Sequence, residues 1–120
     1  MSVYREILPD SYLIILTDAY QASEVEVLQR ALLRAGSSGK AHVWVDCSEW
    51  HQPSEEVIHL LGEFYLQLQH RHIELILCHL EADVQQAVQQ LPTNSQPPVL
   101  ATLLDASLYC RNAAHLRPVA

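Results

Sequence analysis

The chain has 120 residues, of which 49% are hydrophobic, and its formal net charge at pH 7 is −7. This length predicts a single domain spanning residues 1–120, with enough apolar material for one hydrophobic core. The acidic balance, with only seven Lys and Arg scattered along the sequence, argues against binding to nucleic acid or to an anionic membrane surface. An acidic surface is compatible with a protein-binding module and with a soluble enzyme.

Cysteine usage and the N-terminal segment indicate the cellular compartment. The three cysteines, Cys47, Cys78 and Cys110, are far apart and include no C-x-x-C pair, so a disulfide framework is not expected. Segment 1–8 lacks the apolar core of a signal peptide, and the longest purely apolar run, 13–16, is too short to span a bilayer. We therefore expect reduced thiols, a cytoplasmic location and no insertion into a membrane.

The first half of the chain predicts two strands, a helix and a third strand. Val3–Leu8 and Tyr12–Thr17 predict strands that are joined by a short turn and pair as a hairpin. Ala22–Ala35 predicts a helix with Ser23 as its N-cap, because acidic residues follow in the first turn. Ala41–Asp46 predicts the third strand.

The second half of the chain alternates helices and strands. The predicted elements are a long helix, a strand, a helix, a strand and a final helix, at Pro53–His70, Ile73–Cys78, Ala82–Leu91, Val99–Leu104 and Ala106–Ala114. Asp105 is predicted to cap the final helix. The order β-β-α-β-α-β-α-β-α predicts an α/β fold, and strands separated by helices must run parallel. The sheet is therefore expected to be mixed and mainly parallel, with an antiparallel start.

The segment from Val43 to Leu61 carries the most functional information. An apolar strand ends in Asp46-Cys47-Ser48, and after a short loop a helix opens with Pro53-Ser54-Glu55-Glu56. This layout resembles the phospho-acceptor segment of the STAS domain, the anti-sigma-factor-antagonist family of bacterial regulators. In that family the strand ends in D-x-S, and the helix begins with D-S-S-G or D-T-S-G. The order of elements over nearly the whole chain resembles the family too.

The resemblance implies a STAS-like fold and a non-catalytic regulatory module. STAS domains dock on switch-type anti-sigma kinases, on other STAS proteins or on transporter components, and phosphorylation of the second hydroxyl in the tetrad changes their affinity. Asp46 and Ser48 retain the pattern at the end of the strand. The tetrad itself falls on Ser54, Glu55, Glu56 and Val57, so a glutamate that cannot be phosphorylated takes the acceptor position. The usual phosphoswitch is therefore expected to be absent.

Two interpretations apply to the residues at the start of this helix. Ser54 is either an acceptor displaced by two positions or an N-cap that satisfies backbone N–H groups, and capping is favoured. Glu56 is either a fixed negative charge in place of a phosphate or, together with Glu55, a solvated carboxylate that complements the helix dipole; the second is favoured.

A partner-binding surface is predicted around this segment. Its residues are Asp46, Ser48, Trp50, His51, Ser54, Glu55, Glu56 and His59. Core and interface placements for Trp50 are left equally open. The expected partner is a switch-type kinase, another STAS protein, a transporter component or a second copy of the chain. No cofactor is expected.

The alternative functions come from other classes. Cys47, Ser48 and His51 cluster at the end of a strand, where a small-ligand site or a Cys/His hydrolase site is conceivable. No third orienting residue or Gly-rich oxyanion turn accompanies them, which argues against catalysis. A third alternative is a structural subunit that dimerises through a strand edge.

The histidines do not predict a metal centre. His70 and His72 lie at one end of a predicted strand, and Cys78 and His79 lie at its other end, about 20 Å away at about 3.3 Å per residue. No metal site is therefore expected.

Overall fold

The computed structural model describes residues 2–17, 24–52 and 54–116, without the side chains of residues 2, 24 and 110–116. Its elements in chain order are β1 (Ser2–Ile7), β2 (Ser11–Thr17), α1 (Glu24–Gly36), β3 (His42–Glu49), α2 (Glu55–His70), β4 (Glu74–Cys78), α3 (Ala82–Gln89), the 3-10 helix η1 (Thr93–Ser95), β5 (Val99–Leu100) and α4 (Leu103–Leu116). None of the helices in this described part has the length and apolar character needed to cross a bilayer.

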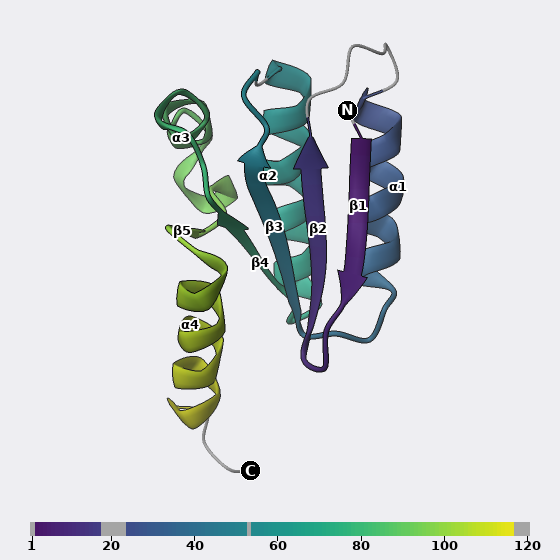
Figure 1. Ribbon diagram of the computed structural model, residues 1–120, viewed down its shortest axis with the longest axis vertical. Coiled ribbons are helices and arrows are strands. Elements are labelled where there is room, and N and C mark those ends of the chain that lie inside the picture. The colour runs from purple at the N-terminus through teal and green to yellow at the C-terminus, as the bar shows by residue number, and fades with distance from the viewer. Residues whose placement is uncertain (1, 18–23, 53, 117–120) are drawn as a thin grey trace.

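The five strands of the described sheet lie side by side in chain order, β1-β2-β3-β4-β5 (Figure 1). β1 pairs antiparallel with β2, and every later neighbour pairs in parallel. Tyr12 of β2 lies opposite Val43 of β3, which in turn lies opposite Leu75 of β4. The predicted mixed, mainly parallel sheet with an antiparallel start is confirmed.

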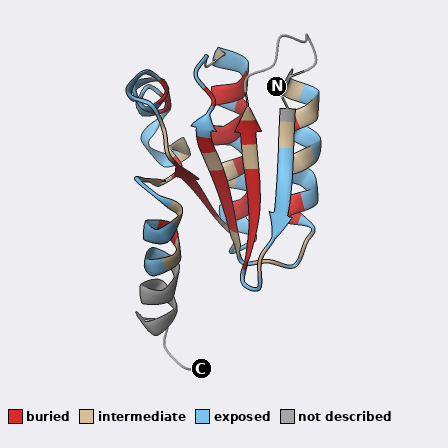
Figure 2. Cartoon of the chain, in the orientation of Figure 1, coloured by how far each residue is buried: buried red, intermediate tan, exposed pale blue. Residues whose placement is uncertain are grey.

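The two faces of the sheet carry separate apolar clusters. Because side chains alternate along a strand, Val43 and Val45 face one side and Trp44 faces the other. The larger cluster contains buried residues of α1, α2 and α3, and Figure 1 shows α1 and α2 behind the sheet. The smaller cluster contains Leu13, Ile76 and, from α4, Ala106. The central strands are buried and β1 is mostly exposed, as Figure 2 shows.

β3 is longer than predicted, because the chain continues as a strand beyond Asp46 to Glu49. Ile15 pairs with Asp46 and Thr17 pairs with Glu49, so three steps along β3 match two steps along β2. This irregularity is a β-bulge around Ser48, and the Asp46 carboxylate accepts a hydrogen bond from the Ser48 backbone N–H at 3.0 Å. The D-x-S pattern therefore lies inside the strand rather than at its end.

Further differences from the prediction concern the length of the last strand and the starts of two helices. β5 contains only Val99–Leu100, so the prediction that this strand reaches Leu104 was wrong. The hydroxyl of Thr102 accepts a hydrogen bond from the backbone N–H of Asp105 at 3.1 Å. Thr102, not Asp105, therefore caps α4, which begins three residues earlier than predicted.

α2 begins at Glu55, two residues after the predicted start. Pro53, and the predicted cap Ser23 of α1, lie outside the described residues.

Candidate docking surface at the start of helix α2

Ser54 holds the start of α2 in place. Its backbone is extended, with φ −100° and ψ 148°, and its hydroxyl oxygen accepts a hydrogen bond from the backbone N–H of Val57 at 3.3 Å. These are the features of an N-cap, so the capping interpretation is confirmed. Glu55 and Glu56 follow in the first turn with exposed side chains, where the positive end of the helix dipole favours carboxylates.

The bulge of β3 brings Ser48 to the same edge of the sheet. Ser48 is exposed, whereas Asp46 is half-buried and its carboxylate is occupied by the Ser48 backbone N–H. The aspartate therefore orders the backbone here, and the serine hydroxyl is available to solvent.

Trp50 does not lie on this surface. It is only 1% exposed and belongs to the larger apolar cluster, and its backbone N–H donates to the carbonyl oxygen of Cys47 at 3.0 Å. That turn folds the chain back so that the indole enters the core. Of the two placements left open for Trp50, the structure shows the core, so including it among the partner-binding residues was wrong.

His51 connects this loop to the start of α3. Its Nδ1 lies 2.5 Å from Oε1 of Glu81, the residue at the N-cap of α3, and both side chains are about half exposed at 47% and 48%. Glu81 was not predicted as part of the site. Only the parallel packing of β3 and β4 places the two residues together, and no local pattern signals it.

The remaining predicted residues come from the end of β3, the loop after it and the start of α2. We name this set of residues the β3–α2 surface and define it by Asp46, Ser48, His51, Ser54, Glu55, Glu56 and His59. Ser54, Glu55 and His59 border a hollow of about 210 Å³ between α2 and α3. Ile58, Ala87 and Leu91 line its apolar part, and Gln90 completes the lining. A hollow of this size accommodates one side chain of a partner rather than a whole ligand.

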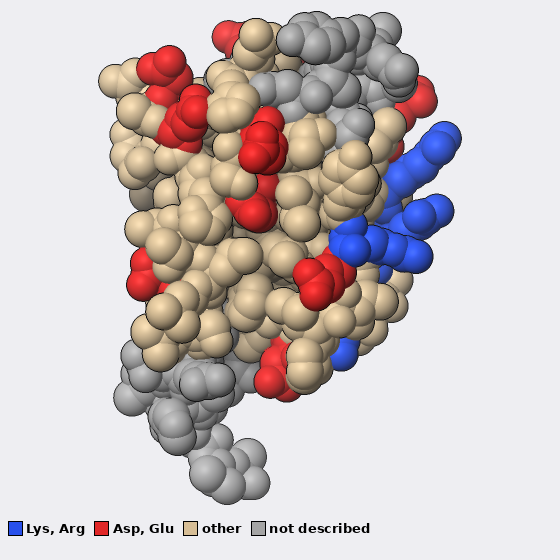
Figure 3. Space-filling view, in the orientation of Figure 1, with Lys and Arg blue, Asp and Glu red and all other residues tan. Residues whose placement is uncertain are grey.

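The sequence segment that forms this surface carries acidic residues and no Lys or Arg. Residues 41–70 contain no Lys or Arg, and their carboxylates belong to Asp46, Glu49, Glu55, Glu56 and Glu63. Arg71 lies at the other end of α2, where its guanidinium donates to the carbonyl oxygen of Gly36 at 2.8 Å. In Figure 3 the visible Lys and Arg side chains gather along one edge, beside β1 and α1, and the acidic side chains are spread over the rest of that face.

Cys47 lacks the properties of an activated nucleophile. Its side chain is fully buried, and its thiol lies 3.7 Å from the carbonyl oxygen of Val45. Burial raises the pKa of the Cys47 thiol far above its ordinary value, and the neighbouring charges of Asp46 and Cys78 raise it further. The thiolate needed for attack is therefore strongly disfavoured, and His51 is exposed and paired with Glu81.

Potential metal ligands are dispersed. Within the described ranges, no group of three His, Cys, Asp or Glu side chains is close enough to hold an ion. His72 and His79 flank opposite ends of β4, and both have left-handed backbone angles with φ of 60°. They serve chain reversal at the ends of the strand.

Comparison with solved structures identifies the fold. A serine-to-glutamate variant of RsbS from Moorella thermoacetica has a TM-score of 0.80 and 13% identity, over 97% of this chain and 100% of that chain. A chain of the stressosome, a signal integration and transduction hub, has a TM-score of 0.76 and 12% identity, over 94% and 100%. The anti-sigma factor antagonist SpoIIAA, in its unphosphorylated form, has a TM-score of 0.71 and 12% identity, over 92% and 98%.

No family model matches the sequence, and no curated protein sequence matches it. The likeness is thus one of three-dimensional structure. The fold is STAS-like, as the order of elements predicted.

Proposed function

We propose that this chain, whose fold is STAS-like, is a non-catalytic regulatory module that binds a protein partner through the β3–α2 surface. The observation that carries the proposal is the exposed Glu56 in the first turn of a helix that Ser54 caps. The neighbouring Ser54 and Glu55 border a hollow, and the segment around them is acidic. The structural likeness to an anti-sigma factor antagonist and to a stressosome component supports a role in regulation.

Glu56 takes the position that a phosphorylatable hydroxyl occupies in the resembled pattern. A carboxylate there provides a permanent negative charge near the positive end of α2, without a kinase. Ser54 is a poor substitute acceptor, because its hydroxyl is half-buried and already accepts from Val57. We infer that binding is set by this fixed charge and is not switched by phosphorylation.

The partner is expected to present basic side chains. The carboxylates of the surface favour Lys and Arg across an interface, and complementary charges accelerate encounter and exclude acidic competitors. A switch-type kinase, another STAS protein or a transporter component fits this role if its docking face is basic. A second copy of the chain would need to present its α1 edge, where Arg30 and Arg34 are exposed.

The test measures the affinity of a purified partner, first recovered by affinity capture from the source cell. Glu56→Ala should weaken binding about fivefold, since one charge contact at an interface contributes about 1 kcal/mol. Asp105→Ala is the matched control, because Asp105 is also an exposed carboxylate in the first turn of a helix but lies on α4. Titration calorimetry should find its affinity unchanged.

Two outcomes would overturn the proposal. Equal affinities for wild type, Glu56→Ala and Glu56→Ser would show that the partner does not use this surface. A gain of phosphate by the wild-type protein, seen by intact-mass measurement after incubation with ATP and a kinase partner, would contradict the fixed-charge part.

A further inference from the structure

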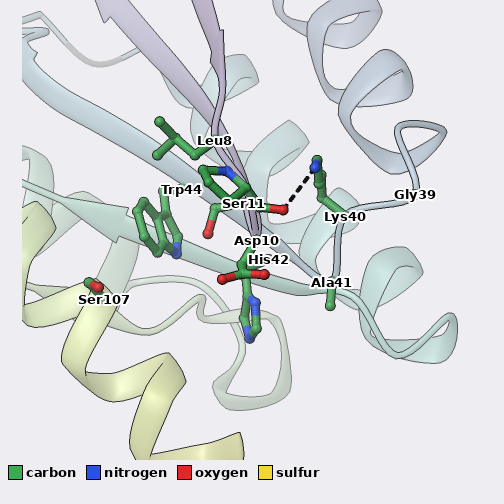
Figure 4. A pocket seen from close by; sticks show the side chains of 10 residues that line it. Leu8, Asp10, Ser11, Gly39, Lys40, Ala41, His42, Trp44 and Ser107 are labelled. Carbon is green, nitrogen blue, oxygen red and sulfur yellow. Dashed lines mark hydrogen bonds between the residues drawn. The ribbon is translucent and has the colours of Figure 1, made fainter.

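A second cavity lies at the other end of β3, away from the β3–α2 surface. Its volume is about 730 Å³, within the range of small-molecule sites. The β1–β2 turn, the segment before β3, the first residues of β3 and Ser107 of α4 surround it (Figure 4). Leu8 and Pro9 supply apolar wall, together with the ring of Trp44.

Two buried polar atoms on the wall of this cavity lack a hydrogen-bond partner among the described residues. They are Nε1 of Trp44 and Nδ1 of His42. Trp44 is 8% exposed, and an indole N–H can only donate. A buried donor without an acceptor is costly, so the site favours a molecule that supplies one.

Both atoms belong to side chains that line the cavity, and the atoms themselves are closed to solvent. His42 and Trp44 are two residues apart on one strand, so their side chains lie on the same face of the sheet. In Figure 4 the indole nitrogen is on the edge of the ring toward Asp10 and His42, not on the edge toward Leu8. The cavity therefore has a polar side and an apolar side.

The charges around the cavity decide what kind of molecule fits. The Lys40 ammonium already donates to the carbonyl oxygen of Pro9 at 2.9 Å. The Asp10 carboxylate opposes its charge, and Oε2 of Glu74 lies 4.0 Å from Nε2 of His42. Among the described side chains around the cavity, carboxylates at least balance the one cation, so an anionic ligand gains little.

We propose that this cavity binds a small, uncharged, planar molecule, namely a nitrogen heterocycle or an aromatic amide. After a small rotation of the two rings toward the cavity, its carbonyl oxygen or ring nitrogen accepts the hydrogen bond from Trp44 Nε1 and its second polar group pairs with His42 Nδ1. Its apolar face contacts Leu8 and Pro9. The site is independent of the proposed docking function, because Trp44 faces away from the larger cluster that supports α2.

The test uses the indole N–H resonances in a ¹⁵N–¹H spectrum of the full chain. Only two tryptophans are present, and Trp50 is buried in the other cluster, so it serves as an internal control. Nicotinamide and adenine at millimolar concentration are the uncharged probes, and benzoate is the charged comparator. The Trp44 resonance should shift saturably with the uncharged probes while the Trp50 resonance stays in place.

Two variants complete the experiment. Trp44→Phe keeps an aromatic ring without the donor and should weaken nicotinamide binding about tenfold, as followed by backbone amide shifts. Ser107→Phe leaves Trp44 intact and should abolish the shift by filling the cavity. The proposal is overturned if neither uncharged probe moves the Trp44 resonance, if benzoate binds more tightly than nicotinamide, or if Trp44→Phe, with a native-like spectrum, binds nicotinamide as well as wild type does.

Discussion

The burial of the Cys47 thiol favours the docking interpretation of this segment over the catalytic one. Cys47 lies between Asp46 and Ser48, the two residues that mark the resemblance, yet its side chain points into the larger cluster. Alternation along β3 explains this, since Cys47 lies on the same face as Val43 and Val45, while Ser48 in the bulge is exposed. The residue is therefore part of the support of the surface rather than part of its chemistry.

The pH dependence of the free energy of unfolding should reveal the raised pKa of Cys47. Its pKa in the folded state is raised above the ordinary value of 9.0, so the unfolded chain loses the thiol proton first. The contribution of this group is fully present below pH 9.0 and declines above it by about 1.4 kcal/mol per pH unit. Urea denaturation of wild type and Cys47→Ala from about pH 7 to about pH 10 should show the wild-type advantage shrinking above pH 9.0. A difference that is constant over this range would contradict the raised pKa.

At the scale of elements, two hydroxyl caps determine where the helices around the two sites begin. Ser54→Ala and Thr102→Ala should each lower the free energy of unfolding by about 1 kcal/mol, because each removes the acceptor of a first-turn N–H group. Ser54→Asp and Thr102→Ser keep an acceptor and serve as controls in the same urea titration. If the alanine variants match their controls, the cap hydrogen bonds contribute nothing.

The sequence predicted most elements because their patterns are local. Alternation and apolar runs indicated the strands, and acidic first turns indicated the helices around the predicted surface. The final strand was overextended because Leu103 and Leu104 form an apolar pair that suits a strand or a helix. Leu104 is 69% exposed on α4, and the hydroxyl and carbonyl oxygens of Thr102, which accept from the backbone N–H groups of Asp105 and Ala106, mark the helix start.

The sequence predicted the positions of only those candidate residues that belong to one continuous segment. Ser54 and Glu56 were predicted from the start of a helix, and the structure has both in the cap and first turn of α2. Trp50 and Glu81 depend on how the loop after β3 packs against the rest of the protein, and the bulge that redirects this loop has no local signal. The cavity beside Trp44 depends on α4 in the same way.

At the scale of the whole molecule, β3 joins two sites with different electrostatic character. Its last residues belong to the acidic β3–α2 surface, and its first residues line a cavity whose described side chains are balanced in charge. The two sites also differ in which face of the sheet supports them, since Val43 and Val45 belong to one cluster and Trp44 to the other. Salt should therefore affect the two binding reactions differently.

The association rate of the partner should fall steeply as ionic strength rises, because steering by the acidic surface is screened when the Debye length drops from about 10 Å at 0.1 M to about 3 Å at 1 M. Surface plasmon resonance at these two ionic strengths measures it, and Glu56→Lys should reduce both the rate and its salt dependence. Nicotinamide binding to the cavity provides the contrast, since an uncharged ligand in a charge-balanced site should be nearly insensitive to salt. An association rate that is equally insensitive would show that the docking face is not the acidic one.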